Sequence, residues 1–250
     1  MPTFTLLHTN DFHNHLTDAQ ALKLKARRAA LGDSGLLLDA GDAISSGNIT
    51  YKAGGEPILD VMSDAGYDAM TVGNREFHFS QAGFFAKVSR ARFPILCANV
   101  RGSRTNEPVT KLPVVPYIEK KVSDIRVAIF GLTVPMITER MLSRKVSAYV
   151  FDDPLKTAEN LVAKLRPRSD VLVCLSHIGL AKDRELAERV PGIDLIIGGH
   201  THAVLETGEM VDGTVIVQAG WWGKYLGTIT ADVCLTGEGK ASFTSMIEPL

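Results

Sequence analysis

The sequence predicts an α/β fold in a single domain, because strand and helix patterns alternate along a chain that can bury a large core. Short apolar runs that stop at a small or polar residue are typical of core strands. With 250 residues, 45% of them hydrophobic, we expect one domain over 1–250. The predicted strands lie at 4–7, 36–38, 69–72, 171–175 and 195–197, and segments of helix formers alternate with them at 19–30, 56–65, 80–91 and 153–165.

The four helices are predicted from their first turns and their apolar faces. Asp18 precedes 19–30 as its expected cap, and Pro154 occupies a first-turn position in 153–165, where proline is tolerated. Because strands and helices alternate, we expect these helices to cross over between strands and to cover sheet faces. The helix at 153–165 places its apolar residues on one face: Leu155, Ala158, Leu161, Val162 and Leu165.

Further strands are predicted in the second half of the chain. The runs 118–121 and 126–132 are joined through a Ser-Asp turn, which is typical of a hairpin that feeds a central strand. The runs 214–219 and 225–235 are expected to close the fold as antiparallel strands. The chain is therefore expected to end in sheet.

Two stretches are predicted to be loops. The stretch 101–116 is rich in Gly, Pro, Ser and Asn, and we expect it to divide two halves of one fold. The stretch 41–55 begins and ends with glycine and is long enough to line a pocket.

The composition argues against several classes of partner. Lys and Arg (27) nearly balance Asp and Glu (28), so no overall positive field attracts nucleic acid or an anionic membrane, and we expect neither as a partner. No apolar stretch approaches the length of a membrane span. The three cysteines are an odd number without metal-site spacing, which suits a reducing cytosol. The N-terminus has no signal-peptide pattern, so we expect a cytoplasmic location.

Residues with metal-binding side chains follow each of the five predicted strands. In open α/β sheets ligands gather beyond the carboxyl ends of strands, so these side chains are expected to meet at one edge. Asp11 and His13 lie two residues apart, hence on the same side if the backbone stays extended. Glycines before several of these residues allow close backbone approach. The candidate ligands are Asp11, His13, Asp42, Asn74, His177, His200 and His202.

The chemistry of these side chains indicates the class of metal. Nitrogen and oxygen donors without a thiolate fit Mn²⁺, Zn²⁺, Fe or Co²⁺ better than Ca²⁺, and do not choose among them. The opposing interpretation is that the residues cap turns and helices and bond to the backbone. Four of the seven histidines fall at predicted strand ends, which scattered structural histidines would seldom do. The metal site is therefore the favoured interpretation.

Seven blocks of sequence, spread over nearly the whole chain, carry a family resemblance. They are 7–13 (LHTNDFH), 41–42 (GD), 73–77 (GNREF), 176–180 (SHIGL), 197–202 (IGGHTH), 218–220 (QAG) and 225–227 (YLG). In this order they resemble the calcineurin-like metallophosphoesterases, and most closely the catalytic domain of the 5'-nucleotidase group. The C-terminal nucleotide-recognition domain that usually accompanies this catalytic domain is expected to be absent from the 250 residues.

The resemblance implies a four-layer αββα sandwich with two central mixed sheets and a centre of two divalent metal ions. It assigns one ion to Asp11, His13, Asp42 and His202 and the other to Asp42, Asn74, His177 and His200, so that Asp42 bridges. The implied activity is hydrolysis of small phosphomonoesters or phosphodiesters, with nucleotides among the candidate substrates. The alternatives are hydrolysis of another ester-like anion at the same centre, or a metal-bound binding or regulatory module without turnover.

The chain departs from the resembled family at the third motif. Most relatives have a histidine after the asparagine, whereas this chain has Arg75, which can stabilise developing charge but cannot donate and recover a proton. An aspartate usually follows three residues later, where this chain has His78. One hypothesis makes Arg75 an electrostatic clamp and His78 the catalytic acid. Its rival is that His78 caps the following helix or faces solvent.

Substrate contacts are predicted for four residues. Asn74 and Arg75 adjoin the expected metal centre, and the adjacent Trp221 and Trp222 could stack on a base or another flat group. The alternative for the tryptophans is that one packs in the core and the other covers a surface groove.

Overall fold

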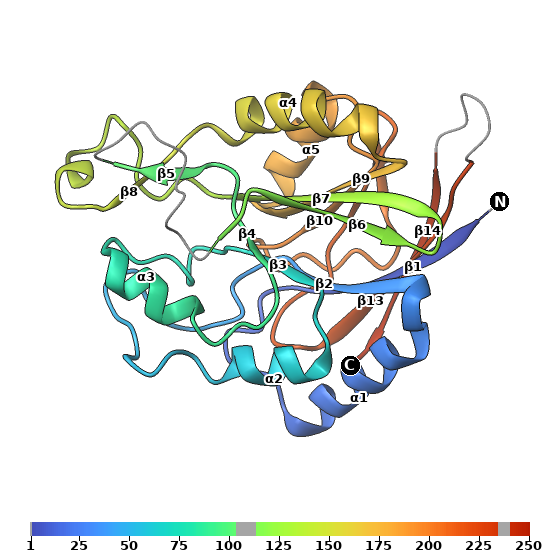
Figure 1. The fold of residues 1–250 in the computed structure, drawn as a ribbon, viewed down its shortest axis with the longest axis horizontal. Coiled ribbons are helices and arrows are strands. Elements are labelled where there is room, and N and C mark those ends of the chain that lie inside the picture. The colour runs from blue at the N-terminus through green and yellow to red at the C-terminus, as the bar shows by residue number, and fades with distance from the viewer. Residues whose placement is uncertain (1, 104–113, 235–240) are drawn as a thin grey trace.

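A computed structural model describes residues 2–103, 114–234 and 241–250. Two six-stranded sheets pack face to face, and helices cover the outer face of each, as Figure 1 shows. The helices α1, α2 and α3 lie on one side of the sheet pair, and α4 and α5 lie on the other. The four-layer αββα sandwich with two central mixed sheets is therefore confirmed.

The first sheet has the strand order β14-β13-β1-β2-β3-β4. Its strands β1 to β4 are mutually parallel, and β13 runs antiparallel to both β1 and β14. The three strands predicted in the first third of the chain are confirmed, whereas β4 and β14 were not predicted. The bounds are β1 Thr3–Thr9, β2 Gly35–Asp39, β3 Ala69–Thr71, β4 Ile95–Leu96, β13 Tyr225–Asp232 and β14 Ser242–Pro249.

The second sheet has the order β11-β12-β10-β9-β7-β6. The predicted hairpin is confirmed, since β6 pairs antiparallel with β7 and β7 lies parallel beside β9. The bounds are β6 Tyr117–Val122, β7 Ile125–Thr133, β9 Val171–His177, β10 Leu195–Gly198, β11 Glu209–Val211 and β12 Thr214–Val217. A separate two-stranded sheet joins β5 Val100–Gly102 to β8 Tyr149–Phe151.

The expectation for the closing strands was wrong in one respect. The run 214–219 contributes β12, which lies parallel to β10, and β12 and β13 belong to different sheets. The reason is that β11 and β12 form a hairpin, which turns the chain back into the direction of β10. Most of the predicted loop at 101–116 lies outside the described residues, but it separates the parallel strands of the first sheet from the second sheet.

The helices differ from the prediction at two points. The cap of α1 is Thr17 instead of Asp18, because the Thr17 hydroxyl accepts the Gln20 N–H and the Gln20 side chain accepts the Thr17 N–H in return. Helix α5 was not predicted, since its sequence LAKDRELAER is mostly charged and buries only a narrow stripe. The α-helices are α1 Asp18–Leu31, α2 Ile58–Ala65, α3 Gln81–Val88, α4 Pro154–Leu165 and α5 Leu180–Arg189, and the 3₁₀ turns are Gly32–Ser34, Leu142–Lys145 and Arg166–Arg168.

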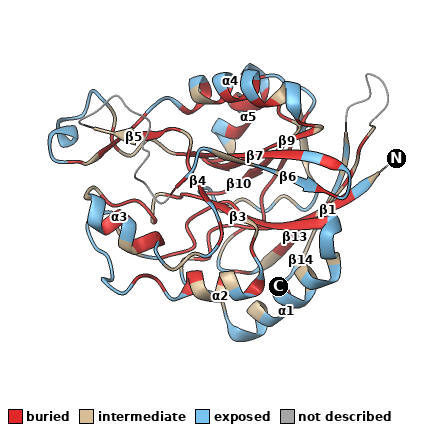
Figure 2. Cartoon of the chain, viewed as in Figure 1, coloured by how far each residue is buried: buried red, intermediate tan, exposed pale blue. Residues whose placement is uncertain are grey.

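Three apolar layers hold the four layers of the fold together. Alternate residues of a strand face opposite sides, so Leu36 and Leu38 of β2 pack between the sheets while Leu37 packs beneath α1 to α3. In the same way Leu172 of β9 packs under α4 and α5. Figure 2 shows the buried strands enclosed by helices whose outer faces are exposed. No helix in the described part of the chain is long and apolar enough to cross a membrane.

Candidate metal centre

The loops after five parallel strands bring the candidate ligands to one edge of the sandwich. Strands β1, β2 and β3 of the first sheet precede Asp11 and His13, Asp42, and Asn74. In the second sheet His177 is the last residue of β9, and β10 precedes His200 and His202. The site therefore joins two sheets, and its donors come from segments up to 191 residues apart, Asp11 and His202. Residues so far apart converge because the parallel strands of each sheet end at the same edge.

The backbone at five of the seven candidate ligands is not extended, which corrects the premise used for Asp11 and His13. Nine non-glycine residues in the described chain have positive φ, and the five ligand candidates among them are Asp11, His13, Asp42, His200 and His202, at 54°, 48°, 56°, 74° and 56°. Left-handed backbone costs free energy in residues with a Cβ and clusters at functional sites. These tight turns therefore direct the two carboxylates and the three imidazoles toward the centre of the site.

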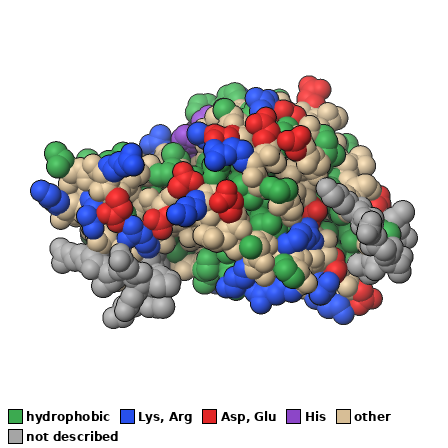
Figure 3. Space-filling model, turned by 90° about the horizontal axis from the view of Figure 1, so that it is seen from above, with side chains coloured by type: hydrophobic (Ala, Val, Ile, Leu, Met, Phe, Trp, Pro, Cys, Tyr) green, Lys and Arg blue, Asp and Glu red, His purple; other side chains and the backbone are tan. Residues whose placement is uncertain are grey.

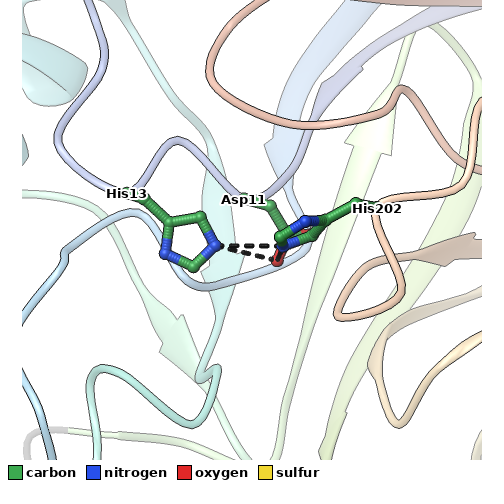
Figure 4. Close-up of side chains that lie close together, drawn as sticks. All are labelled: Asp11, His13 and His202. Atoms are coloured by element: carbon green, nitrogen blue, oxygen red, sulfur yellow. Dashed lines mark hydrogen bonds and ion pairs between the residues drawn. The ribbon is translucent and has the colours of Figure 1, made fainter.

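Asp11, His13 and His202 form the first group of donors. In Figure 4 the two imidazoles approach the Asp11 carboxylate from separate loops. Asp11 Oδ1 lies 3.6 Å from His13 Nε2 and 3.3 Å from His202 Nε2, and the two ring nitrogens are 3.1 Å apart. Three donors at mutual distances of this size surround a point where a single ion can sit.

The orientation of Asp11 leaves one carboxylate oxygen free. Oδ2 accepts the Asn10 side-chain amide at 2.8 Å and the His200 backbone N–H at 2.9 Å. Oδ1 is buried and has no hydrogen-bond partner. An unpartnered buried carboxylate oxygen is costly unless something absent from the protein atoms satisfies it, and a metal ion fits that description.

Asp42 and His177 extend the site toward the second sheet. His177 is buried and its Nδ1 donates to the Ala40 carbonyl at 2.6 Å, which fixes the ring and leaves Nε2 buried without a partner. His177 Nε2 lies 3.4 Å from Asp42 Oδ1, and His13 Nε2 lies 4.0 Å from Asp42 Oδ2. The two oxygens of Asp42 therefore face the two different histidines.

Asn74 and His200 complete the set. The Asn74 side-chain oxygen lies 3.0 Å from His200 Nδ1, and the Arg75 backbone N–H donates to Asp42 Oδ1 at 2.7 Å. Glycine at position 41 lets the loop after β2 come close to Gly73 and His177, because a Cβ there would lie 2.7 Å from the Gly73 nitrogen and 3.0 Å from His177 Nδ1. All seven predicted ligands thus lie in one connected cluster.

The charges of this cluster perturb its pKa values strongly. Burial alone would raise the pKa of Asp11, but the imidazoles of His13 and His202 hold it well below its ordinary value. Burial disfavours a charged His177, yet the carboxylates of Asp42 and Asp11 raise its pKa to about 10. The proton held by His177 therefore offsets the negative charge of the neighbouring buried carboxylates.

From the sequence Glu76 could support an imidazole ligand or begin a helix, and in the structure it instead supports the backbone of the site. It is fully buried, and its carboxylate accepts the backbone N–H groups of Gly73 at 2.7 Å, Asp42 at 3.0 Å and Ile44 at 3.2 Å. One side chain therefore joins the loop after β2 to the loop after β3. A sequence pattern shows only that a glutamate is near the motif, since its backbone acceptors are set by the fold.

A pocket of about 450 Å³ opens over the cluster, a size typical of small-molecule sites. Figure 3 shows histidine side chains reaching the surface beside basic side chains. Arg75 reaches into the pocket, with its Nε 4.0 Å from Asp42 Oδ2. The lining residues are His13, His15, Asp42, Ser45, Asn74, Arg75, His200, His202 and Trp222. His15, for which the sequence indicated no role, thus belongs to the pocket.

Comparison with known proteins places this geometry in a family. Residues 4–204 match the calcineurin-like phosphoesterase family. The chain belongs to this family. The matched range contains all seven candidate ligands. Phosphoesterases of this family use divalent metal ions, for which the described residues include candidate ligand groups.

Proteins similar to this chain include a nucleotide phosphoesterase and 5'-nucleotidases. This chain is 36% identical to the trifunctional nucleotide phosphoesterase protein YfkN of Bacillus subtilis, and the match covers 94% of this chain and 18% of that protein. It is 30% identical to the 5'-nucleotidase of Rattus norvegicus, covering 97% of this chain and 48% of that protein. The crystal structure of a 5'-nucleotidase precursor from Thermus thermophilus superposes with a TM-score of 0.81 at 28% identity, covering 99% of this chain and 54% of that one. The chain thus spans half or less of the length of these two curated relatives.

His78 of this calcineurin-like phosphoesterase lies in a packed environment. It is 3% exposed, its Nδ1 accepts the Ser80 backbone N–H at 3.0 Å, and its ring stacks on Phe79. Ser80 is the N-cap of α3, so His78 supports the start of that helix. It is not among the described residues that line the pocket. Of the two interpretations of His78, this placement favours the structural one.

Lys87 was also not singled out from the sequence. It is a buried lysine of α3, and its ammonium donates to the carbonyls of Gly47 at 2.8 Å, Arg75 at 2.6 Å and Phe77 at 2.9 Å. Burial lowers its pKa to about 8. Lys87 therefore joins helix α3 to the backbone of Arg75 and to the 41–55 loop. As predicted, this loop lines the pocket, to which it contributes Asp42 and Ser45.

The two tryptophans occupy different positions. Trp221 stacks on the His202 ring, with centroids 5.6 Å apart and planes 20° apart, and the Lys224 ammonium lies 4.0 Å from its centre. Trp222 is 46% exposed and lines the pocket. Trp221 therefore supports a candidate ligand, whereas Trp222 borders the space in which a substrate would bind.

Proposed function

We propose that this chain hydrolyses small phosphomonoesters or phosphodiesters, nucleotides among them, at a centre of two divalent metal ions. One ion would be held by Asp11, His13, Asp42 and His202, and the other by Asp42, Asn74, His177 and His200. The observation that carries the proposal is a pair of buried donor atoms without a hydrogen-bond partner, Asp11 Oδ1 and His177 Nε2. Each belongs to a group of three side chains that could hold an ion: Asp11, His13 and His202 in one, and Asp11, Asp42 and His177 in the other. Oxygen and imidazole donors fit Mn²⁺, Zn²⁺, Fe or Co²⁺.

Such a pair of ions supplies a hydroxide nucleophile at neutral pH and neutralises charge on the phosphate oxygens. The chain itself orients the donors: Ala40 fixes the His177 ring, and Glu76 holds the backbone on both sides of Asp42. Both contacts are buried, so the donors keep their positions before a substrate arrives, which lowers the reorganisation that binding requires.

Arg75 is the proposed phosphate-binding residue. Its side chain is 43% exposed and lines the pocket, while its Nε is buried and has no hydrogen-bond partner. A guanidinium in this position offers planar donors to two phosphate oxygens and keeps its charge throughout the reaction. We therefore assign Arg75 to the stabilisation of negative charge, and not to proton transfer.

The proposal is tested by reconstituting the metal-free chain with Mn²⁺ or Zn²⁺ and measuring hydrolysis of p-nitrophenyl phosphate and bis-p-nitrophenyl phosphate. We expect turnover of at least one ester, at a rate that a chelator abolishes and fresh metal restores. A chain that binds two ions and yet hydrolyses neither these esters nor a nucleoside 5'-monophosphate would instead be a metal-bound binding module, and the proposed activity would be wrong.

A further inference from the structure

One wall of the pocket is aromatic and is formed by His15 and Trp222. Their ring centroids are 4.6 Å apart and their planes are inclined by 33°. Both residues line the same pocket as five of the candidate ligands and Arg75. His15 follows β1 and Trp222 precedes β13, so the fold brings together two rings from opposite ends of the chain. Neither ring contributes to the proposed metal ligands.

The Trp222 ring is held in place by its backbone. Trp222 has a φ of 60°, a conformation that is strained for a bulky residue, and glycine would adopt it freely. Its N–H donates to the Asp11 carbonyl at 2.8 Å, and the carbonyl of the next residue, Gly223, accepts the Gln20 side-chain amide at 2.8 Å. The ring is therefore fixed relative to a candidate metal ligand. A strained, exposed tryptophan in a pocket points to a function for its side chain.

A large aromatic side chain that is 46% exposed leaves apolar surface in contact with water. Trp221, its neighbour in sequence, covers its own surface by stacking on His202 and by contact with Lys224. Trp222 presents its ring beside His15 at the pocket, and the Lys224 ammonium lies farther from its ring centre, at 5.9 Å. A planar ligand that stacks on this wall would bury the exposed surface while its phosphate lies against Arg75 and the ligand cluster.

We propose that His15 and Trp222 form a stacking site for the leaving group, so that the substrates are phosphate esters whose leaving group carries a planar aromatic ring. This inference rests on the proposed function, because the same pocket must hold the phosphate. A volume of about 450 Å³ is large enough for a ligand with both a phosphate and a ring. The aromatic wall then selects among phosphate esters, and the metal centre and Arg75 act on all of them.

The test compares 5'-AMP with ribose 5-phosphate, which has the same phosphate and sugar but no ring. We expect the intact, metal-loaded chain to prefer 5'-AMP in kcat/KM by about tenfold or more, since stacking of a base on an aromatic side chain contributes an effect of this order. Trp222→Gly removes the ring and suits the backbone conformation, and it is expected to bring the ratio close to one. Trp222→Phe, which retains a ring, is expected to restore most of the preference.

The matched control is Phe85→Ala, which removes another exposed aromatic ring, on α3 and outside the pocket lining. It should leave the ratio at its wild-type value. Phenyl phosphate distinguishes a general aryl group from a nucleobase. If Trp222→Gly lowers the hydrolysis rates of both phenyl phosphate and 5'-AMP, the site accepts any aryl group. If it lowers only the rate of 5'-AMP, the site accepts a nucleobase. Either result supports the stacking site.

Equal kcat/KM values for 5'-AMP and ribose 5-phosphate in the wild-type chain, or a preference that survives Trp222→Gly, would overturn the inference while leaving the proposed hydrolysis intact. If the chain hydrolyses neither 5'-AMP nor ribose 5-phosphate, that result would count against the proposed function instead. In that case calorimetric binding of the two phosphates to the metal-loaded chain makes the same comparison without turnover, and equal affinities would exclude the stacking site.

Discussion

Replacement of Asp42 by alanine is expected to abolish phosphate ester hydrolysis and to reduce the metal content below two ions per chain. Asp42 is assigned to both proposed ion sites, and its two oxygens face His177 and His13. Loss of a partner that only supports a metal ligand already costs about 10–100-fold in affinity or activity, so removal of a shared ligand should cost more than about a hundredfold. Elemental analysis and the ester assay measure both quantities.

Asp42→Asn is the matched variant, because asparagine has the same shape and tolerates the left-handed backbone at φ 56°. It keeps an acceptor for the Arg75 N–H and removes only the charge. We expect Asp42→Asn to fold with a lower thermal stability than the metal-free wild type, because buried His177 loses a carboxylate partner, and to bind metal weakly. Two bound ions and wild-type turnover in Asp42→Ala would show that Asp42 is not the bridging ligand.

Replacement of Arg75 by methionine is expected to lower kcat/KM for phosphate esters by about 10²–10³-fold, the usual effect of removing one group that stabilises charge in a transition state. The metal content should stay at two ions, since the Arg75 side chain is not a proposed ligand. Arg75→Lys keeps the charge without the planar fork and is expected to recover part of the rate. Steady-state kinetics on one monoester and one diester provide the measurement.

Arg144→Met is the matched control for the change in net charge, because Arg144 pairs with Glu139 outside the pocket lining. Its kinetics should equal those of the wild type.

Arg75→His adds a qualitative check. A catalytic imidazolium must be protonated, so its contribution to the rate falls as pH rises through its pKa, whereas arginine gives no such decline. Wild-type kinetics in Arg75→Met would remove the assignment of Arg75 to charge stabilisation.

The ligand positions could be predicted because they follow from strand ends. An apolar run such as the one before His177 marks a core strand, and the polar residue that follows must lie at the carboxyl edge of a sheet. The same reasoning located Asn74 and His200, although they belong to different sheets. What the pattern could not supply was the backbone: Asp11 and His13 point together through left-handed turns, and not through an extended segment.

The supporting groups were beyond the reach of the sequence for a physical reason. Glu76 and Lys87 bond to backbone groups of other loops, and a backbone acceptor or donor leaves no mark on residue type. Helix α5 was missed because a charged sequence buries only Asp183, Leu186 and Ala187. His15 lies two residues beyond a candidate ligand, so the sequence allowed it to reach the rim of the site or to cap a turn. Its contact with Trp222, about 200 residues later in the chain, is visible only in the folded pocket.

Anomalous diffraction from crystals of the wild-type chain grown with Mn²⁺ tests the central claim most directly. We expect two anomalous peaks, one bounded by Asp11, His13 and His202 and the other by Asn74, His177 and His200, with the Asp42 carboxylate between them. A single peak, or peaks that Asp42 does not contact, would contradict the two-ion centre.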